Sequence, residues 1–359
     1  MLTDKEIQTI KDHQAQSIKH RALVKEQLEM IYASNWFNIW VPTLYKGKGL
    51  SLVDGCALLE ELAYWDGGLA WTVTLCAGAN MFAGYIDPKI AQTVFSDPKV
   101  CLGGSGRVGG KAVWDGEKYT ISGVWQFATG APHLTHFTLN CFIYYGDEQQ
   151  VDAGGNPLVY SFFVPKDKVL IHYDWDTFGL ECTASHSFSL ENVKVEANYS
   201  FQIKPEHGQV DEPLFRIPFM PFAEVTLLVN YMGMYRRFLD LVEKYFFDKS
   251  KDTFWESTYS KQRFKLVDEC QIGLAGDRKK TTELIATLWD KNVESPIAEN
   301  DLLLQEIALF SRSVVERIRE RVVQLFPLVG ISGAQRENEL NIVFRNIFTA
   351  TQHSLLNIS

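Results

Sequence analysis

The sequence has no long hydrophobic run, few prolines and no paired cysteines. No stretch approaches about 18 uninterrupted apolar residues, so we expect no membrane span. With 12 prolines and 25 glycines in 359 residues, low-complexity and collagen-like chains are excluded. The cysteines form no CxxC pair, and no histidine stands beside them at metal-ligand spacing: Cys56, Cys76, Cys101, Cys141, Cys182 and Cys270. We therefore expect reduced, buried thiols rather than a disulfide framework, and no metal site.

The charge balance excludes two further classes of partner. The chain has 35 lysines and arginines against 44 aspartates and glutamates, a net charge of −9. This balance disfavours general binding to nucleic acid or to an anionic membrane. The first residues, MLTDKEIQTIKDHQ, are charged and lack the apolar core of a signal peptide, so we expect a cytoplasmic protein.

The hydrophobic pattern changes twice along the chain and predicts an α+β protein with three domains. Residues 1–98 carry apolar residues at helical spacing, and residues 99–205 contain short β-branched and aromatic runs separated by turn residues. Residues 206–359 return to long amphipathic stripes. We expect an N-terminal helical domain, a central antiparallel β-barrel or sandwich, and a C-terminal four-helix bundle.

A GxGxxG motif at 104–109 is the first candidate for a cofactor-binding segment. A dinucleotide-binding loop needs a strand before the motif and a helix after it. Here residues 110–122 alternate like a hairpin with its turn at Asp115 and Gly116, so no helix N-terminus can face a pyrophosphate. The motif therefore does not indicate a Rossmann domain.

A second candidate follows at 123–137. If 123–128 is a strand, Trp125 and Phe127 lie on the same side of it. Thr129 and Gly130 then supply a hydroxyl, backbone amides and a close approach for a flat polar heterocycle. The same residues also describe a β-turn with packed aromatic side chains. Residue chemistry alone favours this simpler interpretation.

Five segments, taken in order, resemble the acyl-CoA dehydrogenase superfamily. Residues 123–137 (GVWQFATGAPHLTHF) are similar to its flavin-cradling strand and loop, which runs G-x-W-x-F-x-S-G-x-x-H-A-x-W in the oxygenase branch. The others are similar to its Y-G-G-x-G-L loop, its E-E-L-A helix, its L-G-M-R-G-T-G-S-H turn and its R-D-x-x-x-A-x-x-H helix: 42–50, 59–71, 178–186 and 344–353. The resemblance spans essentially the whole chain and implies the superfamily's helix, β-domain and four-helix-bundle layout.

The resemblance also implies which residues serve the site. The closing histidine of the oxygenase branch, which acts near the substrate or flavin, maps to His353, and its flavin-contacting serine maps to Thr129. Trp125 would stack on the isoalloxazine, beside Phe127 and Gly130, and Ser185 would lie near the flavin or the substrate entrance. The dehydrogenase glutamate is missing from 344–356, which leaves Glu224 as an alternative base.

Two positions depart from the family pattern. Asn346 stands where the family has aspartate, and Glu181 where it has arginine.

The function implied is a flavin-dependent oxidoreductase with FAD or FMN. The oxygenase branch would use reduced flavin from a separate reductase, and O2, on a small aromatic or apolar substrate, and would assemble as a homotetramer. One alternative is an acyl-CoA dehydrogenase that oxidises the CH–CH bond of an acyl-CoA with FAD. Another is a non-catalytic flavin-binding or structural homologue.

Overall fold

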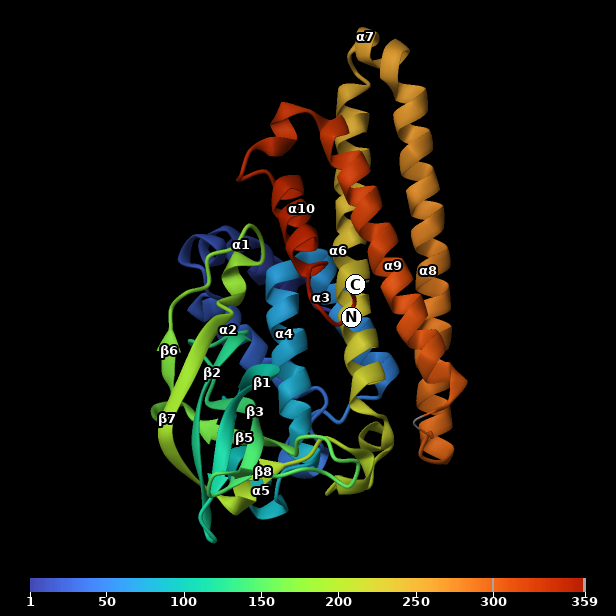
Figure 1. The fold of residues 1–359 in the computed structure, drawn as a ribbon. Coiled ribbons are helices and arrows are strands. Elements are labelled where there is room, and N and C mark those ends of the chain that lie inside the picture. The colour runs from blue at the N-terminus through green and yellow to red at the C-terminus, as the bar shows by residue number, and fades with distance from the viewer. Residues whose placement is uncertain (299, 358–359) are drawn as a thin grey trace.

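A computed structural model describes residues 1–298 and 300–357 (Figure 1). The N-terminal helices are α1 (Asp4–His20), α2 (Lys25–Ala33), α3 (Leu52–Trp65), α4 (Gly67–Asn80) and α5 (Pro88–Val94). The strands are β1 (Leu102–Trp114), β2 (Lys118–Ala128), β3 (His136–Tyr145), β4 (Glu148–Gln149), β5 (Val159–Pro165), β6 (Leu170–His172), β7 (His186–Glu196) and β8 (Ser200–Phe201). The C-terminal helices are α6 (Phe219–Lys249), α7 (Thr253–Trp255), α8 (Lys261–Glu294), α9 (Leu302–Leu325) and α10 (Glu339–Ala350).

Local sequence signals begin and end elements where we expect them. Asp87 caps α5 by accepting from the amides of the first turn, and Pro88 occupies the first helical position, which needs no amide donor. The hairpin between β1 and β2 turns at Asp115, whose carboxylate accepts from the Lys118 amide at 2.8 Å. Gly116 takes a φ of +104° there, a conformation that favours glycine.

The strands form one open sheet instead of the expected closed barrel or two-layer sandwich. Their order is β6-β7-β2-β1-β3-β5-β8, with β4 paired to β3. The expectation of an entirely antiparallel sheet is also wrong, because β1 and β3 run parallel. The parallel pair arises because the β1–β2 hairpin is followed by a loop that returns the chain to the far side of β1.

The GxGxxG motif lies inside β1, which confirms that it opens no helix. Its glycines permit close strand packing instead. A Cβ on Gly104 would lie 1.8 Å from the carbonyl oxygen of Thr138, and one on Gly109 would lie 2.4 Å from that of Val124. The register of β1 against β3 shifts in this stretch, as it does at a β-bulge.

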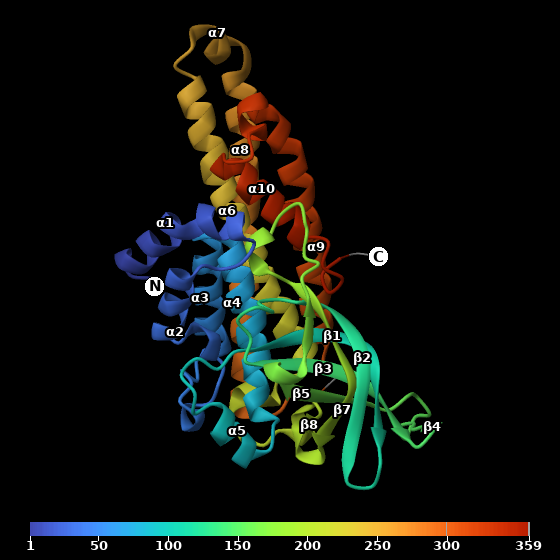
Figure 2. The ribbon, with the colours of Figure 1, turned by 90° about the vertical axis from the view of Figure 1, so that its left-hand side faces the viewer.

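Helix α4 lies between the sheet and the long C-terminal helices (Figures 1 and 2). It contacts β1 on one side and α6 on the other, and twelve of its 14 residues are buried. A helix that is apolar all round can be stable only in such a position. Residues on α4 therefore reach both the sheet and the helical layer.

The C-terminal region is helical, as expected, with α6 at its centre. α6 is 31 residues long and packs against α8, α9 and α10, and also against α3 from the N-terminal region. α10 has only 12 residues, so the long helices are not four of equal length. Because α3 also packs on α6, the helices before and after the sheet share one packed layer.

The division of the chain into three domains at residues 98 and 205 stays a prediction. Among the described helices, none combines the length and the apolar character that crossing a membrane requires.

The close packing of α3 against α6 predicts that one methyl group added at Gly233 lowers the stability of the fold. A Cβ on Gly233 would lie 2.2 Å from the Glu60 carbonyl oxygen and 2.8 Å from the Ala63 Cβ. We expect Gly233→Ala to lower the free energy of unfolding by about 1–3 kcal/mol, because backbone on both sides must move. Gly273→Ala on α8 is the matched control, since no atom lies within 4 Å of its Cβ position. It should raise stability by about 0.5–1 kcal/mol, and equal effects in urea unfolding would contradict this packing.

Candidate functional site

The end of β2 presents one aromatic ring to solvent. The pairing of β2 with β7 shifts register between Trp125 and Ala128, and Phe127 takes a φ of +68° within this irregularity. The Phe127 side chain is 55% exposed, and its ring meets that of Trp175 edge-on, with centroids 6.2 Å apart. An exposed phenyl ring in a left-handed backbone conformation is unusual and points to a site that a ligand covers.

Trp125 lies in the sheet core, contrary to the expectation that it shares a side with Phe127. Its indole is 1% exposed, stacks on Phe188 at a centroid distance of 5.4 Å, and donates from Nε1 to the Asn140 carbonyl oxygen at 2.9 Å. Glycines 109, 110 and 123 pack directly against it. The register shift breaks the simple alternation on which the expectation rested. A flavin-stacking role for Trp125 does not fit this burial, and Phe127 is the better placed ring.

Thr129 and Ser185 are brought together although 56 residues separate them. Their hydroxyl oxygens lie 2.9 Å apart, both side chains are buried, and the Thr183 hydroxyl lies 2.8 Å from that of Ser185. The Gly130 amide donates to the Thr183 carbonyl oxygen at 2.8 Å, and Gly130 itself needs a φ of +78°. Three hydroxyls in a chain hold one another in place and keep unused donor and acceptor capacity at its ends.

His353 lies just beyond α10 and against α4. Its ring meets the Trp71 indole edge-on at 5.8 Å. The preceding end of α10 is held by the Tyr231 hydroxyl, which donates to the Ala350 carbonyl oxygen at 2.7 Å. Burial, together with the positive charge of Arg107 on β1, lowers the pKa of His353 below its ordinary value. The imidazole is therefore neutral at neutral pH and able to accept a proton.

Glu224, the alternative base, is buried on α6 and faces α9. Its carboxylate accepts from Arg312 at 2.9 Å. Burial raises the pKa of Glu224, and the Arg312 charge offsets this only in part. Among the described residues, no hydrogen bond links Glu224 to the groups around Thr129 or His353. The structure therefore gives this glutamate a structural partner.

The two departures from the family pattern belong to one contact between the 178–186 turn and α10. Glu181 forms a buried ion pair with Arg345, and the Asn346 side-chain oxygen accepts from the Leu180 amide at 2.7 Å. Arg345 also donates to the Phe178 carbonyl oxygen at 2.7 Å. The acidic residue at 181 thus has a cation on α10, and the neutral residue at 346 satisfies a backbone donor. Both departures therefore contribute to the same contact between the 178–186 turn and α10.

A cluster that sequence spacing could not reveal lies behind Thr129 and Gly130. The sulfurs of Cys76 and Cys101 and a ring nitrogen of His133 lie within 4.8 Å of one another. Burial opposes ionisation of Cys76, but its interactions with Cys101 and His133 outweigh it and lower the pKa of Cys76 to about 6. Because the three residues are 25 and 32 positions apart, only tertiary structure brings them together.

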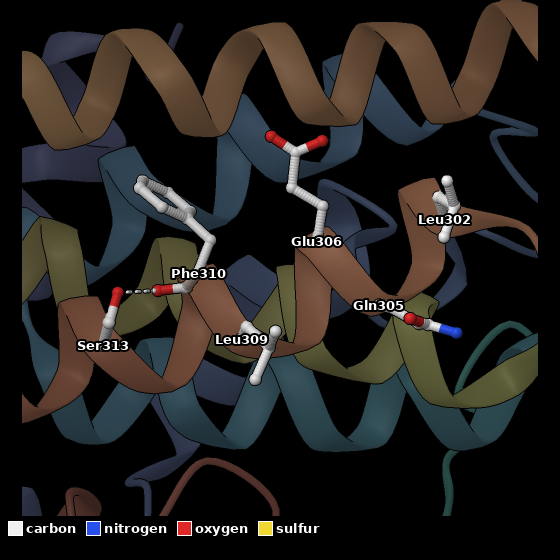
Figure 3. Close-up of a pocket in the computed structure, with 6 residues that line it drawn as sticks. All are labelled: Leu302, Gln305, Glu306, Leu309, Phe310 and Ser313. Atoms are coloured by element: carbon white, nitrogen blue, oxygen red, sulfur yellow. Dashed lines mark hydrogen bonds between the residues drawn. The ribbon is translucent and has the colours of Figure 1, made fainter.

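A separate apolar cavity of about 550 Å³ lies along α9 (Figure 3). It is lined by Leu302, Gln305, Glu306, Leu309, Phe310 and Ser313. These residues belong to the part of α9 that faces α8 and solvent, and none is a predicted site residue. The cavity is therefore a feature of the outer helical surface and not of the site at the end of β2.

The residues at the end of β2 fit a flat heterocycle with one polar edge, such as a flavin. The exposed Phe127 ring offers a surface for an aromatic ring system, and the buried hydroxyls of Thr129 and Ser185 offer hydrogen bonds to its edge. Gly130 follows Thr129 in a turn that needs its positive φ. This donor set suits neutral heteroatoms rather than a metal ion or a phosphate chain.

Known proteins resemble the chain in sequence and in fold. No family model matches the chain. It is 25% identical over 243 residues to the indole-3-acetate monooxygenase of Acinetobacter baumannii. That match covers 65% of this chain and 61% of the relative, so it spans less than two thirds of the relative's length.

Solved structures match over nearly the whole chain. XiaF from Streptomyces sp., in complex with FADH2 and glycerol, has a TM-score of 0.85 and 21% identity, covering 98% of this chain and 90% of that one. Dibenzothiophene monooxygenase (TdsC) from Paenibacillus sp., with FMN and indole, has a TM-score of 0.80 and 16% identity, covering 98% and 93%. The chain has the acyl-CoA dehydrogenase-type fold of the flavin-dependent monooxygenases. The fold that the resemblance implies is thereby confirmed, and the flavins of these neighbours agree with the expected FAD or FMN.

The Glu181–Arg345 pair predicts a strong and non-additive effect on stability. We expect Glu181→Leu to lower the free energy of unfolding by about 3–5 kcal/mol, because it leaves the buried Arg345 guanidinium without a counter-charge. The double variant Glu181→Leu, Arg345→Leu should lose less than the single one. Denaturant unfolding of Glu181→Leu, Arg345→Leu and the double variant measures this coupling, and additive losses would show that the two charges do not depend on each other.

Proposed function

We propose that this chain is a flavin-dependent monooxygenase that receives reduced FMN or FAD from a separate reductase and hydroxylates a small aromatic substrate. One observation carries the proposal. Residues 175–186 contact both halves of the site: Trp175 packs on Phe127, Ser185 bonds to Thr129, and Leu180 and Glu181 bond to α10 just before His353. A flavin-cradling loop and a proton-accepting histidine are thus held by one turn.

Helix α4 supports the same grouping. Trp71 contacts His353, and the Cys76 thiol lies 3.7 Å from the Thr129 carbonyl oxygen. Trp71 and Cys76 are five residues apart on α4, so this one helix contacts both His353 and the loop that carries Thr129. The name of the sequence relative, an indole-3-acetate monooxygenase, and the indole bound to TdsC support an aromatic substrate.

The residues have distinct roles in this proposal. Bound reduced flavin supplies the two electrons that activate O2. Phe127 packs against the ring system, and the Thr129 and Ser185 hydroxyls hold its polar edge. His353, neutral at neutral pH, accepts a proton from the substrate, while the Trp71 indole shields that position from water.

The rival functions have less support. An acyl-CoA dehydrogenase needs a free carboxylate base, whereas Glu224 is engaged with Arg312. A non-catalytic homologue would have no use for a histidine that packs against Trp71 and whose pKa is lowered below its ordinary value. If the purified protein bound neither FMN nor FAD in either redox state, this last alternative would be favoured.

We also propose that the chain assembles as a homotetramer and works in the cytoplasm. Large apolar side chains are exposed along α8 and α9, where a second copy would cover them: Ile272, Leu302 and Leu309, at 73%, 77% and 72% exposure. The six cysteines are all free and buried, which fits a reducing compartment.

The proposal predicts opposite outcomes for two substitutions. With reduced FMN, ¹⁸O2 and indole-3-acetate or indole, the wild-type chain should form a product that carries one ¹⁸O. We expect His353→Ala to lower kcat for this product about 100-fold or more, the usual size of a general-base effect. Glu224→Gln should keep kcat within a few fold.

A pH profile of activity distinguishes a catalytic role of His353 from a structural one. Because the pKa of His353 is lowered, wild-type activity should persist as pH falls to about 6.5 and be lost only below it. This acid limb should vanish from the residual activity of His353→Ala. Loss of activity in Glu224→Gln with activity retained in His353→Ala would overturn the oxygenase proposal, and turnover of acyl-CoA thioesters would then be measured.

A further inference from the structure

Two buried cysteines and one histidine converge on a single point behind the candidate flavin loop. The Cys76 sulfur comes from α4, the Cys101 sulfur from the residue before β1, and the His133 nitrogen from the turn between β2 and β3. All three atoms lie within 4.8 Å of one another. Both cysteines are free and completely buried, so neither is committed to a disulfide.

The surroundings of this cluster leave one nitrogen without a partner. His133 stacks on Phe37, with ring centroids 5.5 Å apart and planes 14° from parallel. Its Nε2 is buried and makes no hydrogen bond within the described part of the chain. A buried polar atom without a partner costs free energy unless something absent from the bare chain satisfies it. A ligand at the centre of the cluster would do so.

The chemistry of the donors selects the ligand. Two thiolates and an imidazole suit Zn²⁺, which binds sulfur at about 2.3 Å and nitrogen at about 2.0–2.1 Å. Donors of one tetrahedral ion then lie roughly 3.5–4 Å apart, so the observed cluster needs only a small contraction. Mg²⁺ and Ca²⁺ prefer oxygen donors, and no carboxylate belongs to this cluster.

The cluster lies against the loop that presents Thr129. The Cys76 thiol lies 3.7 Å from the Thr129 carbonyl oxygen. A Cβ on Gly130 would lie 2.6 Å from the His133 Nε2 and 3.3 Å from the Cys76 sulfur, so the loop backbone rests directly on these groups. An ion at this point would join α4, the start of β1 and the loop that presents Thr129.

We propose that Cys76, Cys101 and His133 form a structural zinc site that fixes the Thr129–Gly130 loop from behind. No metal site was expected from the sequence, because only the spacing of cysteine and histidine along the chain was considered there. The site is independent of the proposed monooxygenase activity, because neither the cluster nor its test involves flavin.

Metal binding to the full-length chain tests the proposal without any measurement of activity. The reduced, metal-free protein is titrated with Co²⁺ in the absence of oxygen, and then with Zn²⁺. We expect one Co²⁺ per chain, a thiolate-to-cobalt charge-transfer absorption, and its complete displacement by one Zn²⁺. Zn²⁺ should also raise the Tm of the wild-type chain, because it binds the folded state.

Variants identify the ligands. Cys101→Ser and His133→Ala should each weaken Co²⁺ binding at least about tenfold and reduce or shift the charge-transfer band. Cys270→Ser is the matched control, because it removes another buried thiol, on α8, outside the cluster, and it should bind Co²⁺ like the wild type.

Three results would overturn the proposal. The first is a wild-type titration without a thiolate band, which decides the matter even if a variant fails to fold. The second is a band that survives in Cys101→Ser but not in Cys270→Ser. The third is a chain in which Cys76 and Cys101 are found as a disulfide and bind no Co²⁺ after reduction.

Discussion

The contact between the 178–186 turn and α10 is the constraint on which the candidate site depends. Ser185 belongs to this turn and bonds to Thr129, while Arg345 and Asn346 on α10 hold the turn from the other side. Because a buried ion pair is tolerated only when both charges are matched, the turn and the helix cannot separate without a large cost in free energy. The hydroxyl pair and the helix that leads to His353 are therefore connected through buried contacts of this turn.

Helix α4 makes this arrangement possible. It is buried between the sheet and α6, and its successive turns contact different parts of the site. Trp71 meets His353, Asp66 caps the helix beside the 178–186 turn, and Cys76 lies against the Thr129 carbonyl. A helix with so few exposed residues has no freedom to shift, because every side chain is packed. The proposed zinc site would add a second restraint at the same helix.

Features set by neighbouring residues were predictable from the sequence. The helix, strand, helix order follows from hydrophobic periodicity, and the Asp87–Pro88 cap and the Asp115–Gly116 turn follow from local hydrogen bonding and backbone conformation. The GxGxxG stretch was correctly excluded as a Rossmann loop because the residues after it alternate. Thr129 and Ser185 came from the resemblance to a family, and the structure brings them together.

Features that depend on tertiary structure were not predictable. Strand alternation put Trp125 and Phe127 on one side, but a register shift against β7 buries one and exposes the other. The sheet that was expected to close stays open because, among the described strands, its end strands β6 and β8 do not pair, and β1 and β3 run parallel within it. Glu181 and Arg345 are 164 residues apart, so the cation that balances Glu181 could not be recognised from the sequence. Cys76, Cys101 and His133 share no spacing that a motif could detect.

A crystal structure of the full-length protein, grown with FMN and reduced anaerobically, tests the central claim most directly. The account predicts density for the isoalloxazine against the Phe127 ring, with its polar edge within hydrogen-bond distance of Thr129 or Ser185 and with the His353 imidazole facing the space above it. Density for the ring system elsewhere, for example in the apolar cavity along α9, would contradict the site described here.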